Sequence, residues 1–354
     1  MSEFTHSSAD RPTTRDQVAR HPMVAFVSLA YAISWTAWLF TYQIDLGTVN
    51  GFGIIGAAAP ALAAMIVSAI LRPEPSGIPN NKRWRLLGIL WASILVVLII
   101  RRLWVVAGLT TVTGRAATTI VYPQLWALLL DALAAVVVAF VLTGFYSSRQ
   151  GVRDVLHSLD PRCQPVRWYW WLIAVGIYPI VIALGNAISA GVGLPGATPK
   201  VTGLWYWQML DALVLFLLVL LGGGGLEEPG WRGFALPLLQ KHYSPLRSSL
   251  ILAVIWALWH WPLFWFGESQ GGLLGVIFFL FGVAPVAILF TAVFNLSGGS
   301  LPIAILLHSS INITGTYLPP SMIATSVWML LILGVAVWMW RSPQTYAPRP
   351  VESL

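Results

Sequence analysis

About ten long apolar segments, separated by short polar or Gly/Pro-containing breaks, run through almost the whole of this 354-residue chain. A helix needs about 20 mostly apolar residues to cross the hydrocarbon core of a bilayer, and most of these segments meet that length. Hydrophobic residues make up 57% of the sequence and charged residues only 9%, a balance that ordinary water-soluble domains do not reach. The sequence therefore predicts an all-α, polytopic integral membrane bundle of about 8–10 transmembrane helices.

The apolar windows set the expected bounds of the spans. They lie at residues 22–42, 52–71, 86–108, 125–145, 168–192, 205–223, 247–266, 272–293, 300–316 and 322–340. A further apolar stretch, residues 226–239, lies between the sixth and seventh windows.

Lys and Arg are concentrated in alternate connections between these windows. Residues 1–21 contain Arg11, Arg15 and Arg20, whereas the next connection contains neither Lys nor Arg. By the positive-inside rule this alternation predicts that both termini are cytoplasmic. We expect the membrane to be the plasma membrane. It weakens after the seventh span, where the connections are nearly uncharged, so the last crossings are predicted from hydropathy alone.

The formal net charge of +7 has no dense basic run or nucleic-acid motif behind it, so we expect membrane lipid and no nucleic acid as a partner. Cys163 is the one cysteine of the chain, which excludes an internal disulfide and a thiolate metal cluster. The sequence carries no signal for an oligomeric state.

Charged residues inside two neighbouring spans form a first polar cluster. Arg101 and Arg102 lie in the third span and Asp131 in the fourth, at nearly the same depth when about 1.5 Å of rise is counted per residue. Ionisable groups within a membrane call for a partner or a function. We favour a structural ion pair between the two helices over the alternative, a site for an anionic substrate.

A second, richer cluster begins where four glycines, residues 222–225, interrupt the sixth span. Four consecutive glycines break or loosen a helix, and Pro229 is tolerated where a new helix begins. Glu228 and Arg232 stand four residues apart, the spacing that favours an ion pair. Glu227 points elsewhere, so one carboxylate is expected to be paired and the other to remain available for proton chemistry.

Two later spans carry further polar residues at helical spacing. Trp256 and His260 share one face of the seventh span, and His308 and Asn312 share one face of the ninth. Glu227 and His260 lie 14 and 13 residues from the turn at residues 241–247, each about 20 Å along a helix. A lone histidine in a Trp-rich helix end is ordinarily an interfacial or core residue, but the common depth predicts that these groups converge.

The expected chemistry of this cluster is amide hydrolysis. A buried carboxylate beside histidine and arginine can serve as a general base near neutral pH, and Glu227 fits that role. Histidine and asparagine side chains can donate hydrogen bonds to a developing oxyanion. The sequence has neither a serine nucleophile elbow nor an HExxH helix, so attack by a glutamate-activated water is the simplest scheme.

Three short motifs in this order resemble those of the CAAX prenyl endopeptidase type II family, also called the CPBP or Abi family. They are Glu227-Glu228-x-x-x-Arg232, Trp256-x-x-x-His260 and His308-x-x-x-Asn312. The resemblance covers roughly residues 204–315, about a third of the chain. The family motif usually has Phe where this chain has Trp256, an exchange that keeps an aromatic ring and bears on pocket shape and substrate choice.

The resemblance implies a role for each of these residues in an intramembrane endopeptidase. Glu227 activates the attacking water with help from His260, and Glu228 with Arg232 holds the site. His308 and Asn312 stabilise the tetrahedral oxyanion. The substrate is a peptide or protein that is membrane-associated or presents a C-terminal tail. The resemblance does not extend to the prenylated CAAX tail that eukaryotic members cleave.

A metal-dependent mechanism is the alternative to a glutamate base acting alone. Glu227, His260 and His308 supply three ligands for Zn²⁺ and leave a fourth position for water. We favour a mechanism without a cofactor, because Asn312 and the paired Glu228 are better explained as oxyanion and orienting groups.

The sequence divides into five regions on this interpretation. They are a polar cytoplasmic N-terminus (1–21), an N-terminal transmembrane region of about five helices (22–200), a CPBP/CAAX-protease-like intramembrane domain (204–316), a last transmembrane helix (322–340) and a cytoplasmic tail (341–354). Two other functions use the same features: a non-proteolytic membrane scaffold or bacteriocin-immunity protein, and a transporter with glycine-broken helices.

Overall fold

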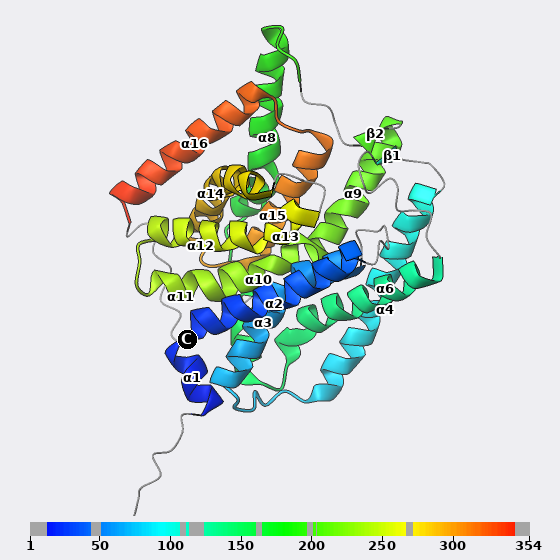
Figure 1. The fold of residues 1–354 in the computed structure, drawn as a ribbon, viewed down its shortest axis with the longest axis vertical. Helices are drawn as coiled ribbons and strands as arrows, with labels where there is room; N and C mark the ends of the chain where they lie inside the picture. Colours follow the sequence, from blue (N-terminus) through cyan, green and yellow to red (C-terminus); the bar gives the residue numbers. More distant parts are fainter. Residues whose placement is uncertain are drawn as a thin grey trace, which may run out of the picture.

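The computed structural model describes residues 13–43, 51–106, 111–112, 124–160, 165–196, 201–202, 204–266 and 272–343. These residues are almost entirely helical (Figure 1), which confirms the predicted all-α membrane bundle. Within them, the one ladder is a two-residue antiparallel pair in which β1 (Thr111–Val112) lies beside β2 (Val201–Thr202). Cys163 and most of the two polar termini lie outside the described residues.

The helices follow the predicted windows closely. They are α1 (Thr14–Arg20), α2 (Pro22–Gln43), α3 (Gly51–Leu71), α4 (Asn80–Val106), α6 (Gln124–Leu142), α7 (Gln150–Leu156), α8 (Tyr169–Gly191), α9 (Trp205–Gly222), α10 (Glu228–Gly230), α11 (Leu236–Gln240), α12 (Pro245–Trp259), α13 (Trp261–Phe266), α14 (Gly272–Leu296), α15 (Leu301–Tyr317) and α16 (Met322–Arg341). Eight segments of the described chain are long and apolar enough to cross a membrane, as expected for a multi-pass protein.

Two of the ten predicted spans are shorter than a full crossing. α15 has 17 residues, and the window at residues 247–266 is divided into α12, with 15 residues, and α13, with 6. The division falls at His260, two residues before Pro262. Proline has no backbone N–H to donate and its ring obstructs a continuing helix, so the chain leaves α12 there and begins α13. His260 therefore lies at a helix end.

The N-terminal helices pack directly against the helices that carry the second polar cluster. In Figure 1, α2 lies beside α3, and α3 passes behind it toward the short helix α10. Gly230 of α10 approaches Pro60 of α3 so closely that a Cβ at position 230 would overlap the Pro60 backbone. The close approach explains why a glycine stands at this point, and it joins the two regions of the chain into one core.

The first polar cluster is only partly described. Asp131 is 1% exposed within the bundle. The side chains of Arg101 and Arg102 lie outside the described residues, so their ion pair with Asp131 stays a prediction.

Candidate active site

The segment that carries the paired glutamates is not one regular helix. α9 ends at Gly222, a 3-10 turn covers Gly224–Glu227, α10 follows, and residues Trp231–Ala235 form a π-helical turn before α11. A Cβ at position 224 would overlap the His308 ring, so a glycine is needed for α15 to approach this turn. π-helical turns inside α-helices are frequent at functional sites. The glycine break predicted from the sequence thus places His308 against the glutamate segment.

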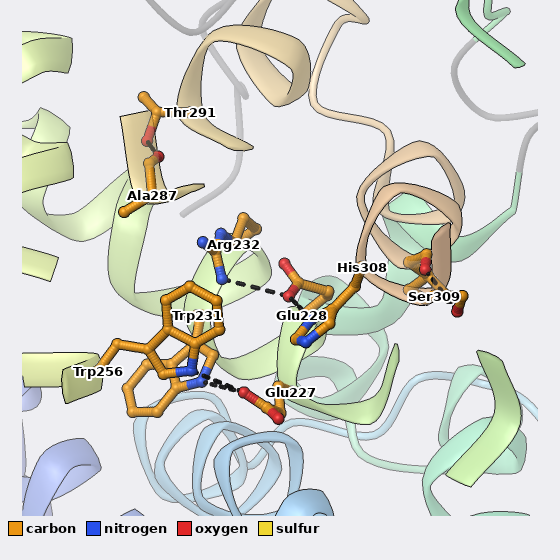
Figure 2. A network of polar contacts seen from close by, with 10 residues as sticks. Glu227, Glu228, Trp231, Arg232, Trp256, Ala287, Thr291, His308 and Ser309 are labelled. Carbon is orange, nitrogen blue, oxygen red and sulfur yellow. Dashed lines mark hydrogen bonds and ion pairs between the residues drawn. The ribbon is translucent and has the colours of Figure 1, made fainter. Parts of the chain in front are cut away.

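Glu228 is the centre of a buried charged group. Its Oε1 accepts a hydrogen bond from Arg232 Nη1 at 3.2 Å and lies 2.6 Å from His308 Nδ1 (Figure 2). Glu228 and Arg232 are 0% exposed and His308 is 5% exposed. The predicted ion pair between residues 228 and 232 is confirmed, and His308 from α15 joins it. Breaking such a pair leaves an uncompensated buried charge, so its members depend on one another.

Two aromatic rings pack against the Arg232 guanidinium. Its Cζ lies 4.1 Å from the centre of the Phe290 ring and 4.7 Å from the centre of the Trp256 ring. A cation over an aromatic face is attracted by the ring quadrupole, most strongly when water is excluded. The two rings hold the guanidinium beside Glu228 from α14 and α12.

Glu227 lies on the other side of the turn and binds neutral donors. Its Oε2 accepts hydrogen bonds from the indole N–H of Trp256 at 2.7 Å and of Trp231 at 3.3 Å. Both bonds are drawn in Figure 2, where the two indoles approach the carboxyl from the same side. Glu227 is 6% exposed. Arg232 thus pairs with Glu228 and not with Glu227, as expected, while the availability of Glu227 for proton chemistry stays a prediction.

His260 lies at the edge of the site, packed among aromatic side chains. Its Nδ1 lies 2.7 Å from the Trp256 carbonyl oxygen, which fixes the ring against the end of α12. The ring packs against Trp259, Trp256 and Phe279, and it stacks on Trp38 of α2 at a centroid distance of 6.3 Å. The structure brings His260 next to the Trp256 side chain rather than into the charged group.

Asn312 is placed differently from the other predicted site residues. It lies one turn beyond His308 on α15, but its side chain is exposed. Its backbone oxygen accepts a hydrogen bond from the Thr316 hydroxyl. Its predicted role as an oxyanion donor stays a prediction.

The described residues contain no group of three His, Cys, Asp or Glu side chains arranged to hold a metal ion. In the predicted set of Glu227, His260 and His308, one carboxylate oxygen is engaged by two indoles and each histidine Nδ1 faces another partner. These contacts involve Glu227 Oε2 and the two Nδ1 atoms, so both the metal-free mechanism and the zinc alternative stay predictions.

Three contributions to the site were not found from the sequence. Trp231 and Phe290 were missed, as was the contact of Trp38 with His260. Trp231 stands four residues after Glu227, the same spacing as Glu228 and Arg232, and this spacing was a usable signal. Phe290 and Trp38 are far from the motifs in sequence and gave no such signal.

Residues 209–314 match the family model described as type II CAAX prenyl endopeptidase Rce1-like. A curated relative, CAAX prenyl protease 2 from Methanococcus maripaludis, is 33% identical over 122 residues. That match covers 32% of this chain and 44% of the relative, so less than half of the relative's length is matched. The resemblance read from the three motifs is confirmed for this part of the chain.

Proposed function

From the similarity of residues 209–314 to the type II CAAX prenyl endopeptidases, we propose that this chain is an intramembrane endopeptidase that hydrolyses a peptide bond with a glutamate-activated water. The arrangement of the two neighbouring carboxylates carries the proposal. Glu228 is bound by Arg232 and His308, whereas Glu227 is held by neutral indole N–H groups on one oxygen alone. Glu227 is therefore the carboxylate that can accept a proton.

In the proposed reaction Glu227 accepts a proton from water as the water oxygen attacks the peptide carbonyl carbon. The carbonyl oxygen becomes an oxyanion in the tetrahedral intermediate. When the C–N bond breaks, Glu227 returns the proton to the leaving amine, and a carboxyl and an amino terminus are formed. The protein regains its starting protonation state, so no co-reactant besides water is consumed.

His308 is the proposed donor to the oxyanion. Donation requires a proton on Nε2, and the Nδ1 of the same ring faces Glu228 at 2.6 Å. Because Nδ1 is engaged by the Glu228 carboxylate, Nε2 is the ring nitrogen proposed to donate to the oxyanion. We propose Asn312, one turn along the same helix, as the second donor, on the strength of the family resemblance.

The substrate is proposed to be a peptide or protein held at the membrane, since the groups named above lie among membrane-spanning helices. The proposal needs no metal or other cofactor. We further propose cytoplasmic positions for both termini, from the alternation of Lys and Arg between spans, and the plasma membrane as the location.

The test is cleavage of a diverse peptide library, including lipidated and membrane-anchored peptides, by the purified protein in nanodiscs. Wild type should cleave, and Glu227→Gln, which keeps the shape and removes the base, should lower kcat on the order of 10²–10⁴-fold. The same reaction with a chelator tests the metal-free mechanism, which predicts unchanged rates.

Equal folding of wild type and Glu227→Gln, measured by thermal unfolding, is the control for this experiment. If well-folded wild type cleaves none of these peptides, the proposal is wrong and a non-proteolytic scaffold or immunity role becomes the better one. Loss of cleavage with the chelator would contradict the metal-free mechanism alone.

A further inference from the structure

We infer that Trp231 and Trp256 are positioning residues that hold the Glu227 carboxyl by one oxygen, so that its other oxygen is turned toward the attacking water. The inference rests on the proposed function, because it assigns a purpose to the orientation of the general base. It concerns two indole N–H groups, which touch Glu227 and no reacting atom.

The two hydrogen bonds converge on Glu227 Oε2 from different parts of the fold. Trp231 belongs to the π-helical turn and stands four residues after Glu227 in sequence. Trp256 belongs to α12 and stands 29 residues after Glu227. Two donors arriving at one oxygen fix the rotation of the carboxyl group about its last side-chain bond. Its orientation is then set by the packing of two separate helices.

Each indole is itself held by packing. Trp231 is 0% exposed, with the Phe26 ring of α2 at 5.4 Å edge to face and Trp259 at 5.7 Å. Trp256 is 5% exposed and lies under the Arg232 guanidinium, with Phe290 at 6.0 Å. A site keeps its geometry when the groups that orient it are locked in turn by their neighbours.

An indole suits this task better than a charged or hydroxyl donor. Its N–H donates but cannot accept, so Trp231 and Trp256 cannot take the proton intended for Glu227. It carries no charge, so the carboxylate is oriented without an ion pair of the kind that Arg232 makes with Glu228. The two carboxylates of the site therefore differ in their donors: Glu228 is ion-paired with Arg232, whereas Glu227 is oriented by neutral indole N–H groups.

The decisive variant is Trp256→Phe, which keeps an aromatic ring over Arg232 and removes the shorter of the two hydrogen bonds. Misplacement of a catalytic group lowers the rate of the chemical step, so we expect kcat to fall on the order of 10–100-fold while KM changes less than about 2-fold. Trp231→Phe removes the longer bond at 3.3 Å and should have a smaller effect in the same direction.

Trp91→Phe is the matched control. Trp91 also donates its indole N–H within the bundle, to the Ala132 carbonyl oxygen at 3.1 Å, but it joins α4 to α6 away from Glu227. It should retain the kcat of the wild type. Replacement of Trp256 by benzothienylalanine, which exchanges the N–H for sulfur at nearly the same shape, repeats the main variant without a change of volume. It should reproduce the loss of kcat.

Infrared difference spectroscopy tests the hydrogen bond itself, independently of cleavage. The carboxyl band of Glu227 is assigned by its disappearance in Glu227→Gln, and it should shift in Trp256→Phe and stay in place in Trp91→Phe. An unshifted band, or an unchanged kcat with a shifted band, overturns the inference. Absence of cleavage by wild type contradicts the proposed function instead. The inference then fails with it, because Glu227 would have no role as a general base.

Discussion

Two regions border the glutamate site, residues 209–314 and the N-terminal helix α2. They contribute polar groups of different kinds. In the first region the contacts of Glu227 and Glu228 join side chain to side chain and include the buried charges of Glu228 and Arg232. In α2 the polar contacts are neutral, and most of them end on backbone oxygens. Tyr31 donates to the Ile255 carbonyl at 2.5 Å, and Trp35 donates to the Trp259 carbonyl at 2.9 Å.

This difference shows that the two regions contribute to the site in different ways. The carbonyl groups in the last turn of a helix have no partner within the helix, and α12 ends beside His260. The Nδ1 of His260 lies at hydrogen-bond distance from the Trp256 carbonyl oxygen, and the indole N–H of Trp35 donates to the Trp259 carbonyl oxygen. The family-like region therefore supplies the charges, while α2, which lies outside that region, stabilises the helix end that carries Trp256 and His260.

The largest stability effect that separates the two regions is expected for Arg232→Met. The variant leaves Glu228 buried without its guanidinium partner, which should cost about 3–5 kcal/mol in the free energy of unfolding. Denaturant titration of the purified protein in mixed micelles measures it.

The double variant Glu228→Gln/Arg232→Met is its control, because it removes both charges. It should recover a large part of the loss, since the penalty comes from the unpaired charge rather than from lost volume. A single variant as stable as wild type would show that the pair is not a buried charged unit, and the contrast between the two regions would disappear.

The sequence predicted the parts of the site that depend on local spacing. The helical windows follow from the length of the apolar segments, and the pairing of Glu228 with Arg232 follows from their separation of four residues. The glycine run correctly indicated a break in the sixth span.

What the sequence did not predict depends on contacts between distant segments. Trp35 and Trp259 are 224 residues apart, and no spacing rule connects them. The exposure of Asn312 was also unexpected, because sharing a helix face with His308 does not determine which neighbours cover that face. The division of the seventh span at His260 was hidden by its continuous apolar composition, although Pro262 gave a signal for it.

A smaller effect is expected when α2 loses one of its neutral contacts. Trp35→Phe leaves the Trp259 carbonyl without its indole donor, which should cost about 1–3 kcal/mol in the free energy of unfolding. Cleavage should fall as well, because the end of α12 carries Trp256 and His260. Trp84→Phe is the control, since Trp84 is 61% exposed and should be nearly neutral. Equal effects of the two variants would contradict the role given to α2.

The smallest effect is expected at the ion pair between Arg15 of α1 and Glu74, which follows α3. Arg15 Nη2 lies 3.6 Å from Glu74 Oε1, and the two side chains are 56% and 57% exposed. Exposed pairs of this kind contribute about 0–1 kcal/mol, because water screens them and both side chains lose freedom. Glu74→Gln should therefore unfold within about 1 kcal/mol of wild type, and any difference should vanish in about 1 M salt, where the screening length is about 3 Å. A loss as large as that of Arg232→Met would mean that the buried and the exposed ion pair contribute equally to stability. The distinction between the charged interior around Glu228 and the neutral contacts of α2 would then fail.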